Sequence, residues 1–175
     1  MASRRFSHAI AEGDGISLVA LASDPETARA AESHGAEAVA VTGNFADVRE
    51  ATTLPILCFW VHAGPSGIRH ADACVVRTSD ADQVEAREGL ELVVWVDDEE
   101  QLEDVLERFD PEILLLNGTF ESVLDLLADV PVGKLVVAEL HDTTGAEFSE
   151  LERAGVDAVI VDPDQHLPEV PATGA

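Results

Sequence analysis

The chain has 175 residues, 46% of them hydrophobic, and no apolar run approaches the ~20 residues that a membrane-spanning helix needs. This composition excludes a membrane-embedded class and favours one soluble domain over residues 1–175. Because 35 acidic residues face ten basic ones, the formal net charge is −25, and no basic stripe is present to meet nucleic-acid phosphates. We therefore expect no membrane and no nucleic-acid partner.

The acidic residues are spread over all the expected helices, and Lys134 is the single lysine. A surface of this kind repels itself in dilute buffer, but at ~1 M salt the Debye length falls to ~3 Å and the repulsion is largely screened. The composition thus indicates the cytoplasm of a halophile that accumulates salt. A function in binding basic proteins is the alternative, which the even spread of acids disfavours.

The first elements in chain order lie at the N-terminus. Residues 1–14 contain two arginines but no apolar segment behind them, so we expect no signal peptide and a cytoplasmic protein. SRRFSHAIAEG (3–13) predicts a short helix before the first strand.

Eight apolar runs then recur along the chain. Each run is continuous rather than alternating and is rich in Val, Ile or Leu, which is typical of parallel strands buried on both faces. The runs are residues 16–21, 37–43, 55–60, 73–77, 92–96, 112–118, 134–140 and 157–162.

Amphipathic segments separate most of these runs and predict helices. The segment after the third run, 61–72, contains Gly64, Pro65 and Gly67, so we expect at most one turn there. After the last strand we expect most of a helix to be missing and 167–175 to be a flexible tail. The predicted helices are 24–35, 44–51, 79–89, 97–110, 120–130 and 143–155.

This alternation of strand and helix, repeated eight times with a period of roughly 20 residues, predicts an α/β fold, a minimal (β/α)8 TIM barrel with several truncated helices. The helix within 1–14 is expected to cap the barrel floor. An open flavodoxin-like sheet needs only about five strands and would leave three runs unexplained.

Cys58 and Cys74 lie inside apolar runs. They are interpreted as reduced core residues, with a disulfide or a two-cysteine metal site as the alternatives. We find no phosphate-binding loop, dinucleotide fingerprint or zinc motif, and we expect no cofactor.

Seven segments along the chain carry a resemblance to a known family, and they are FSHAIAEGDGISLVAL, HGAEAVAVTG, LPILCFW, ADACVV, LVVWVDDEEQLEDVL, EILLLNG and ELERAGVDAVIV. Through these segments the chain resembles the indole-3-glycerol phosphate synthase family of tryptophan biosynthesis. The resemblance implies a barrel related to a carbon–carbon lyase. It also places the family's active-site glutamate at Glu139 and its strand-six asparagine at Asn117, which are the predicted catalytic residues.

The departures from this family concern its charged groups. Phe59 stands where the resemblance implies a strand-three lysine, Trp95 replaces a strand-five glutamate, and Leu21 and Ser23 replace the strand-one glutamate and lysine. Ring closure with loss of water and carbon dioxide needs a positioned proton donor, which Phe59 is not. The active site is therefore interpreted as degenerate.

The implied phosphate pocket departs as well. Asp162 and Asp164 occupy positions where a backbone phosphate cradle favours glycine and excludes carboxylates.

Further candidate ligand-binding residues lie at or just after the ends of the predicted strands. Arg77 is the predicted anion contact, and His141 a predicted ligand contact. Trp60 and Trp95 are predicted ligand contacts too, although they and the aromatics Phe59 and Phe120 could instead fill a lost cavity. A magnesium or manganese site is an alternative that an acidic surface produces by chance, and no metal is predicted. Its residues would be His141, Asp142, Asp162, Asp164 and His166.

Three functional hypotheses follow. The first is a divergent barrel that binds or transforms another small molecule at its mouth. The second is a non-catalytic binding or interaction barrel, and the third an active synthase with relocated catalytic groups. The sequence predicts no particular ligand and no oligomeric state.

Overall fold

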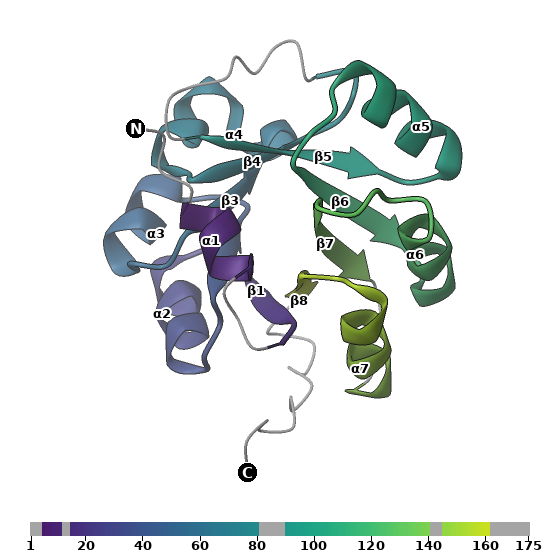
Figure 1. Ribbon diagram of the computed structural model, residues 1–175. Helices are drawn as coiled ribbons and strands as arrows, with labels where there is room; N and C mark the ends of the chain where they lie inside the picture. Colours follow the sequence, from purple (N-terminus) through teal and green to yellow (C-terminus); the bar gives the residue numbers. More distant parts are fainter. Residues whose placement is uncertain (1–4, 12–14, 81–89, 141–144, 162–175) are drawn as a thin grey trace.

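In the computed structural model, which describes residues 5–11, 15–80, 90–140 and 145–161, eight parallel strands close into a barrel in the order β1 to β8 (Figure 1). The β8 strand pairs with β1 and completes the ring. The predicted (β/α)8 fold is therefore confirmed, and the open sheet is excluded. The strands are β1 (Ser17–Ala22), β2 (Ala38–Val41), β3 (Ile56–Phe59), β4 (Ala73–Val76), β5 (Glu91–Val96), β6 (Ile113–Gly118), β7 (Leu135–Leu140) and β8 (Ala158–Val161).

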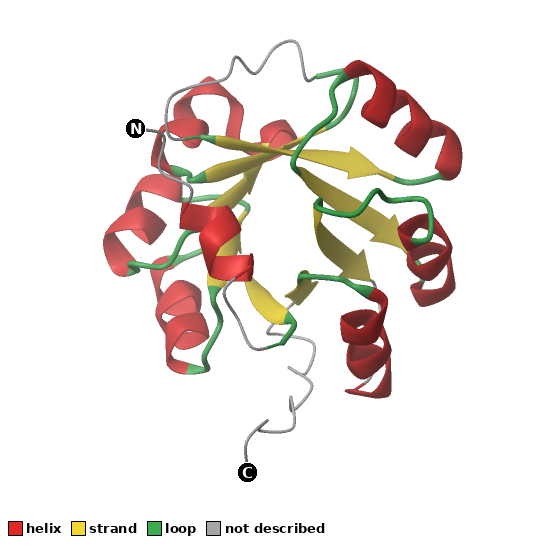
Figure 2. Cartoon of the chain, viewed as in Figure 1, coloured by secondary structure: helices red, strands yellow, loops and turns green. Residues whose placement is uncertain are grey.

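Most of the helices lie around the outside of this ring, and the N-terminal helix lies across one of its ends (Figure 2). Three of them begin at side-chain caps: Asp24, Asp98 and Thr119 each accept a hydrogen bond from a backbone N–H in the first turn. In the described part of the chain no helix is long and apolar enough to cross a membrane. The helices are α1 (Arg5–Ala11), α2 (Pro25–Ser33), α3 (Phe45–Ala51), α4 (Trp60–Gly67), α5 (Glu99–Arg108), α6 (Phe120–Leu127) and α7 (Gly145–Ala154), with a 3-10 turn at Ile68–His70.

The expectation of at most one turn in 61–72 is wrong, because α4 forms there and starts at Trp60 with no loop after β3. Its helix-breaking residues occupy positions that tolerate them. Gly64 makes a kink with φ of 58°, and Pro65 then begins the second turn, where its missing N–H is not needed. Two other predictions, a helix over 79–89 and a tail over 167–175, fall mainly or wholly outside the described residues.

The barrel interior is apolar, and α1 closes its amino-terminal end. Phe6 and Ile10 of α1 are buried in the same cluster as the inward-facing strand residues. The Ser7 N–H donates to a Glu91 carboxylate oxygen at 3.1 Å, and the Ser17 hydroxyl donates to the Ile10 carbonyl at 3.3 Å. These contacts join α1 to the first residues of β5 and β1, at the amino-terminal end of the barrel.

A second apolar cluster lies between the strands and the helices. It contains Cys58 and Cys74, which are neighbours on β3 and β4, buried and not joined by a disulfide. A hydrogen bond with the Cys74 thiol, and then burial, raise the pKa of the Cys58 thiol. Both are therefore reduced core residues, as predicted, and Cys58 is held in the thiol form, which is less reactive than the thiolate.

Candidate functional site

At the carboxyl-terminal end of the strands, the barrel interior ends in a layer of four side chains. Because the strands are tilted and staggered, a layer advances two residues for every two strands beyond the direct pairing partner. This stagger places Leu21, Phe59, Trp95 and Glu139 in one layer, on the inward faces of the alternate strands β1, β3, β5 and β7. Three members of this layer are apolar or aromatic, and Glu139 is the fourth. The floor of the barrel mouth therefore carries one carboxylate.

Glu139 faces the mouth because side chains alternate along β7. Val137 packs in the barrel interior, whereas Ala138 and Leu140 pack under the helices. The register pairs Glu139 with Asn117 on β6 and with Ile160 on β8. Its side chain is half-buried, so it meets the pocket rather than a closed core.

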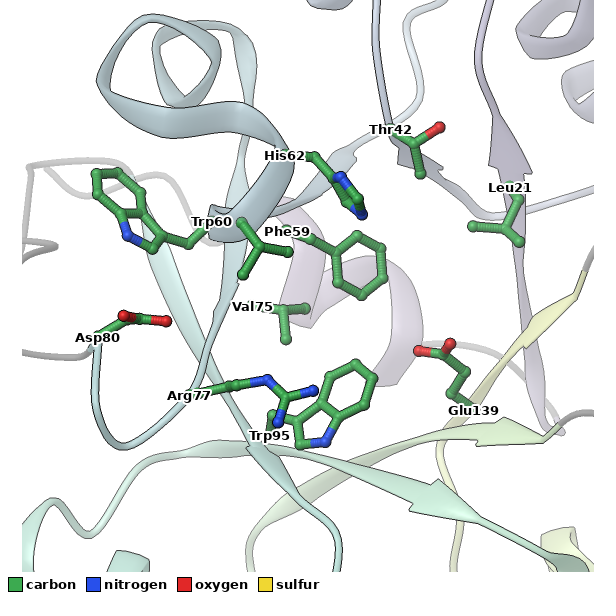
Figure 3. A pocket seen from close by; sticks show the side chains of 11 residues that line it. Leu21, Thr42, Phe59, Trp60, His62, Val75, Arg77, Asp80, Trp95 and Glu139 are labelled. Atoms are coloured by element: carbon green, nitrogen blue, oxygen red, sulfur yellow. The ribbon is translucent and has the colours of Figure 1, made fainter.

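A pocket of about 330 Å³ lies above this layer. All four residues of the layer line it. Thr42, at the end of β2, and Arg77, directly after β4, form part of its rim, and Trp60, Val61 and His62 bring the first turn of α4 to one side (Figure 3). The volume is near the lower end of the ~300–1,000 Å³ typical of small-molecule sites.

The aromatic floor is held by edge-on contacts around Phe59. The rings of Phe59 and Trp95 meet at 69° with centroids 6.4 Å apart, and those of Phe59 and His62 meet at 78° and 6.3 Å. Edge-to-face pairs of this kind fix the ring orientations. Phe59 is buried and Trp95 half-buried, so both fill the barrel while Trp95 still borders the pocket.

Trp95 also connects two charged groups at the rim. Its indole Nε1–H donates to Asp97 Oδ1 at 2.6 Å, and the Arg77 guanidinium carbon lies 4.9 Å from its ring centroid. Arg77 Nη1 lies 3.8 Å from the second oxygen of Asp97. The cation is thereby held over the indole, at the pocket edge.

The predicted ligand residues are brought together in part. Glu139, Arg77, Trp60 and Trp95 line one pocket. Asn117 faces the same end of the barrel one strand away but is not part of the pocket lining.

His141 and the alternative metal ligands Asp142, Asp162, Asp164 and His166 lie outside the described residues. Among the residues that the structure does describe, no three His, Cys, Asp or Glu side chains gather to hold a metal ion. Phe120 packs against the outer apolar cluster rather than in the pocket.

Sequence reasoning did not select Thr42, Asp80 or Asp97 as site residues. Thr42 and Asp80 line the pocket, and Asp97 binds Trp95. Each follows the end of a strand, which is the signal that could have found them.

Comparison with known proteins shows the fold but no family. No family model matches the chain. An indole-3-glycerol phosphate synthase of Geobacillus sp. (strain WCH70) is 32% identical over 81 residues, covering 42% of this chain and 31% of that protein. The alignment thus spans less than a third of the relative, and the likeness is weak and partial.

Two solved structures share the barrel. Phosphoenolpyruvate phosphomutase from Streptomyces platensis subsp. rosaceus superposes with a TM-score of 0.68 at 12% identity, over 94% of this chain and 82% of that one. A phosphonomutase described as putative, from Burkholderia cenocepacia J2315, gives 0.62 at 16% identity, over 85% and 88%. At such identities the likeness concerns the fold alone.

Proposed function

We propose that this protein is a small-molecule-binding barrel that uses its mouth pocket and does not make indole-3-glycerol phosphate. The observation that carries the proposal is the floor layer itself. Glu139 is its one charged group, and aromatic or aliphatic side chains occupy the other three positions. An apolar pocket with few polar groups is typical of a site that orients a small ligand.

The chemistry of this layer argues against the synthase reaction. If the partial likeness extends to the site, Phe59 and Trp95 occupy the places of charged catalytic groups, and neither side chain can deliver a proton to a leaving group. A guanidinium such as that of Arg77 does not serve as a general acid. Lys134 precedes β7 at the opposite end of the barrel, where it pairs with Asp110 at 2.6 Å.

A specific observation supports the relocated-group alternative as second candidate. His62 lies in the first turn of α4 and lines the pocket, so an imidazole is present where a proton donor would be needed. Complementation of a tryptophan auxotroph in salt-adjusted cells separates the two. We expect no growth with folded wild-type protein, and growth that is lost in His62→Gln would contradict our proposal.

Binding itself can be followed by intrinsic fluorescence. The chain has two tryptophans and no tyrosine, and both tryptophans line the pocket. In a screen of single-ring fragments in molar KCl, we expect bound fragments to change this emission. Thr42→Phe, which places a ring at the exposed pocket rim, should abolish the response while thermal unfolding stays unchanged.

The matched control for Thr42→Phe is Thr53→Phe, also at an exposed threonine but away from the pocket, which should respond like wild type. A library without any binder, or binders insensitive to Thr42→Phe, would contradict the proposed function and favour a non-catalytic interaction barrel.

A further inference from the structure

We infer that the mouth pocket selects a small, flat zwitterion, with a carboxylate against Arg77 and a protonated amine against Glu139. This inference rests on the proposed function, because it names the ligand class of the same site. It follows from how the two charged side chains are held, from the charges around them, and from the size of the pocket.

Arg77 is positioned in advance for an anion. Its guanidinium stacks on Trp95, and its contact with Asp97 at 3.8 Å is longer than a hydrogen bond. Within the described part of the chain the Arg77 guanidinium makes no shorter polar contact, and half of the side chain (53%) is exposed. The planar N–H fork thus remains available to a carboxylate, which it matches in a bidentate fashion.

Glu139 lies across the pocket from Arg77, with the indole of Trp95 nearer to the cation (Figure 3). In the floor layer its neighbours are Leu21, Phe59 and Trp95. A carboxylate with apolar neighbours favours a ligand cation, since the interaction is screened less than in open solvent.

The surrounding charges disfavour a phosphate ester. Glu139 and Asp80 line the pocket, and Asp97 lies 3.8 Å from Arg77, so among the described residues at the pocket the carboxylates outnumber the guanidinium of Arg77. A dianionic phosphate would meet net repulsion from these groups, whereas one carboxylate balanced by an ammonium group would not.

The walls limit the ligand to about one ring. The pocket of about 330 Å³ is bordered by the rings of Phe59 and Trp95, and Trp60 lines it with its indole directed away from these two rings (Figure 3). Flat apolar surface is favoured between such side chains. An aromatic ring that carries its two charges at opposite ends fits this arrangement.

The test uses four probes of equal ring size, titrated against the full chain in molar KCl with tryptophan emission and calorimetry. They are 4-(aminomethyl)benzoate with both charges, benzylamine with the cation only, 4-methylbenzoate with the anion only, and phenyl phosphate. We expect 4-(aminomethyl)benzoate to bind about tenfold more tightly than either singly charged probe, and phenyl phosphate to bind weakest.

Two variants assign the charges. Arg77→Met should weaken 4-(aminomethyl)benzoate about tenfold without weakening benzylamine, and Glu139→Gln should weaken both of these probes but not 4-methylbenzoate. Arg69→Met, at an exposed arginine outside the pocket lining, is the matched control and should bind like wild type. Thermal unfolding of each variant verifies that it is folded.

Three outcomes would overturn the inference: phenyl phosphate binding best, Arg77→Met weakening benzylamine as much as the zwitterion, or no binding of any of the four probes. The proposed function is tested separately, because it fails when the fragment screen yields no binder that depends on Thr42, whichever of the four probes bind.

Discussion

Individual residues at the barrel mouth take their roles from strand alternation. Because successive side chains of a strand point to opposite faces, Glu139 meets the pocket while its neighbours Ala138 and Leu140 pack under the helices. Trp95 combines burial of its ring with an indole N–H that reaches Asp97. A polar tip on an apolar body is what lets one residue belong to both the core and the rim.

At the same scale, Asp157 illustrates a carboxylate placed where its charge is unfavourable. It precedes β8 and accepts a hydrogen bond from the Val136 N–H at 2.8 Å. Burial raises the pKa of Asp157 above 3.8, and the hydrogen bond only partly opposes this. The protonated Asp157 carboxyl therefore stabilises the folded state fully below the unfolded-state pKa. This contribution is lost as pH rises through the folded-state pKa.

The prediction for Asp157 concerns Asp157→Asn, which keeps an oxygen acceptor but cannot ionise. The free energy of unfolding of wild type minus that of the variant should decrease as pH rises from about 4 towards 7. Denaturant unfolding across this range measures it. A difference that increases with pH would show that the carboxylate is stabilised, not destabilised, by its surroundings.

Individual site residues could be predicted from the sequence only where a strand end marks them. Glu139, Trp95 and Arg77 satisfy that condition, and the structure brings them to one pocket. Asn117 satisfies it too but is not in the pocket lining, because the layer to which a residue belongs depends on the register between strands. Register is a property of several strands together, and one strand's sequence does not specify it.

Among the elements, the strands were predictable because each is a continuous apolar run, which a doubly covered parallel strand requires. The α4 helix was not, since Gly64 and Pro65 disfavour a continuous helix but permit a kinked one. As α4 starts directly at Trp60, its first turn becomes a wall of the pocket. The prediction of at most one turn after β3 therefore missed the element that forms this wall of the pocket.

The α1 helix offers a prediction at the scale of elements. Phe6 has no exposed surface and packs with the inward-facing strand residues. Phe6→Ala should lower the free energy of unfolding by about 3–5 kcal/mol, since it opens a cavity at the barrel floor. Chemical denaturation measures this, with Ala11→Ser, at an exposed position of the same helix, as control. A loss below about 1 kcal/mol would mean that α1 does not cap the barrel.

For the whole molecule, the closed barrel and the charge of −25 have opposite effects on the stability of the folded state. The ring of strands buries two apolar clusters, whereas the acidic surface favours expansion through self-repulsion. The described ion pairs of Arg5 and Arg49 converge on Asp72 and neutralise little of this charge. Stability should therefore depend on the ionic strength of the solution.

We predict that the melting temperature at neutral pH rises steeply with KCl and levels off near 1 M, as the Debye length falls from ~10 Å at 0.1 M to ~3 Å at 1 M. Near the sequence isoelectric point of about 4.2 the salt effect should be much smaller. Calorimetry at both pH values measures this. Equal salt dependence at the two would assign the effect to general salting-out and not to charge screening.

The most direct test of the central claim is a crystal structure grown in molar KCl and soaked with 4-(aminomethyl)benzoate. We predict one molecule above the Phe59 and Trp95 rings, its amine at the Glu139 carboxylate and its carboxylate at the Arg77 guanidinium. A pocket that stays closed by aromatic side chains, or a Glu139 side chain directed outward among the helices, would contradict the account.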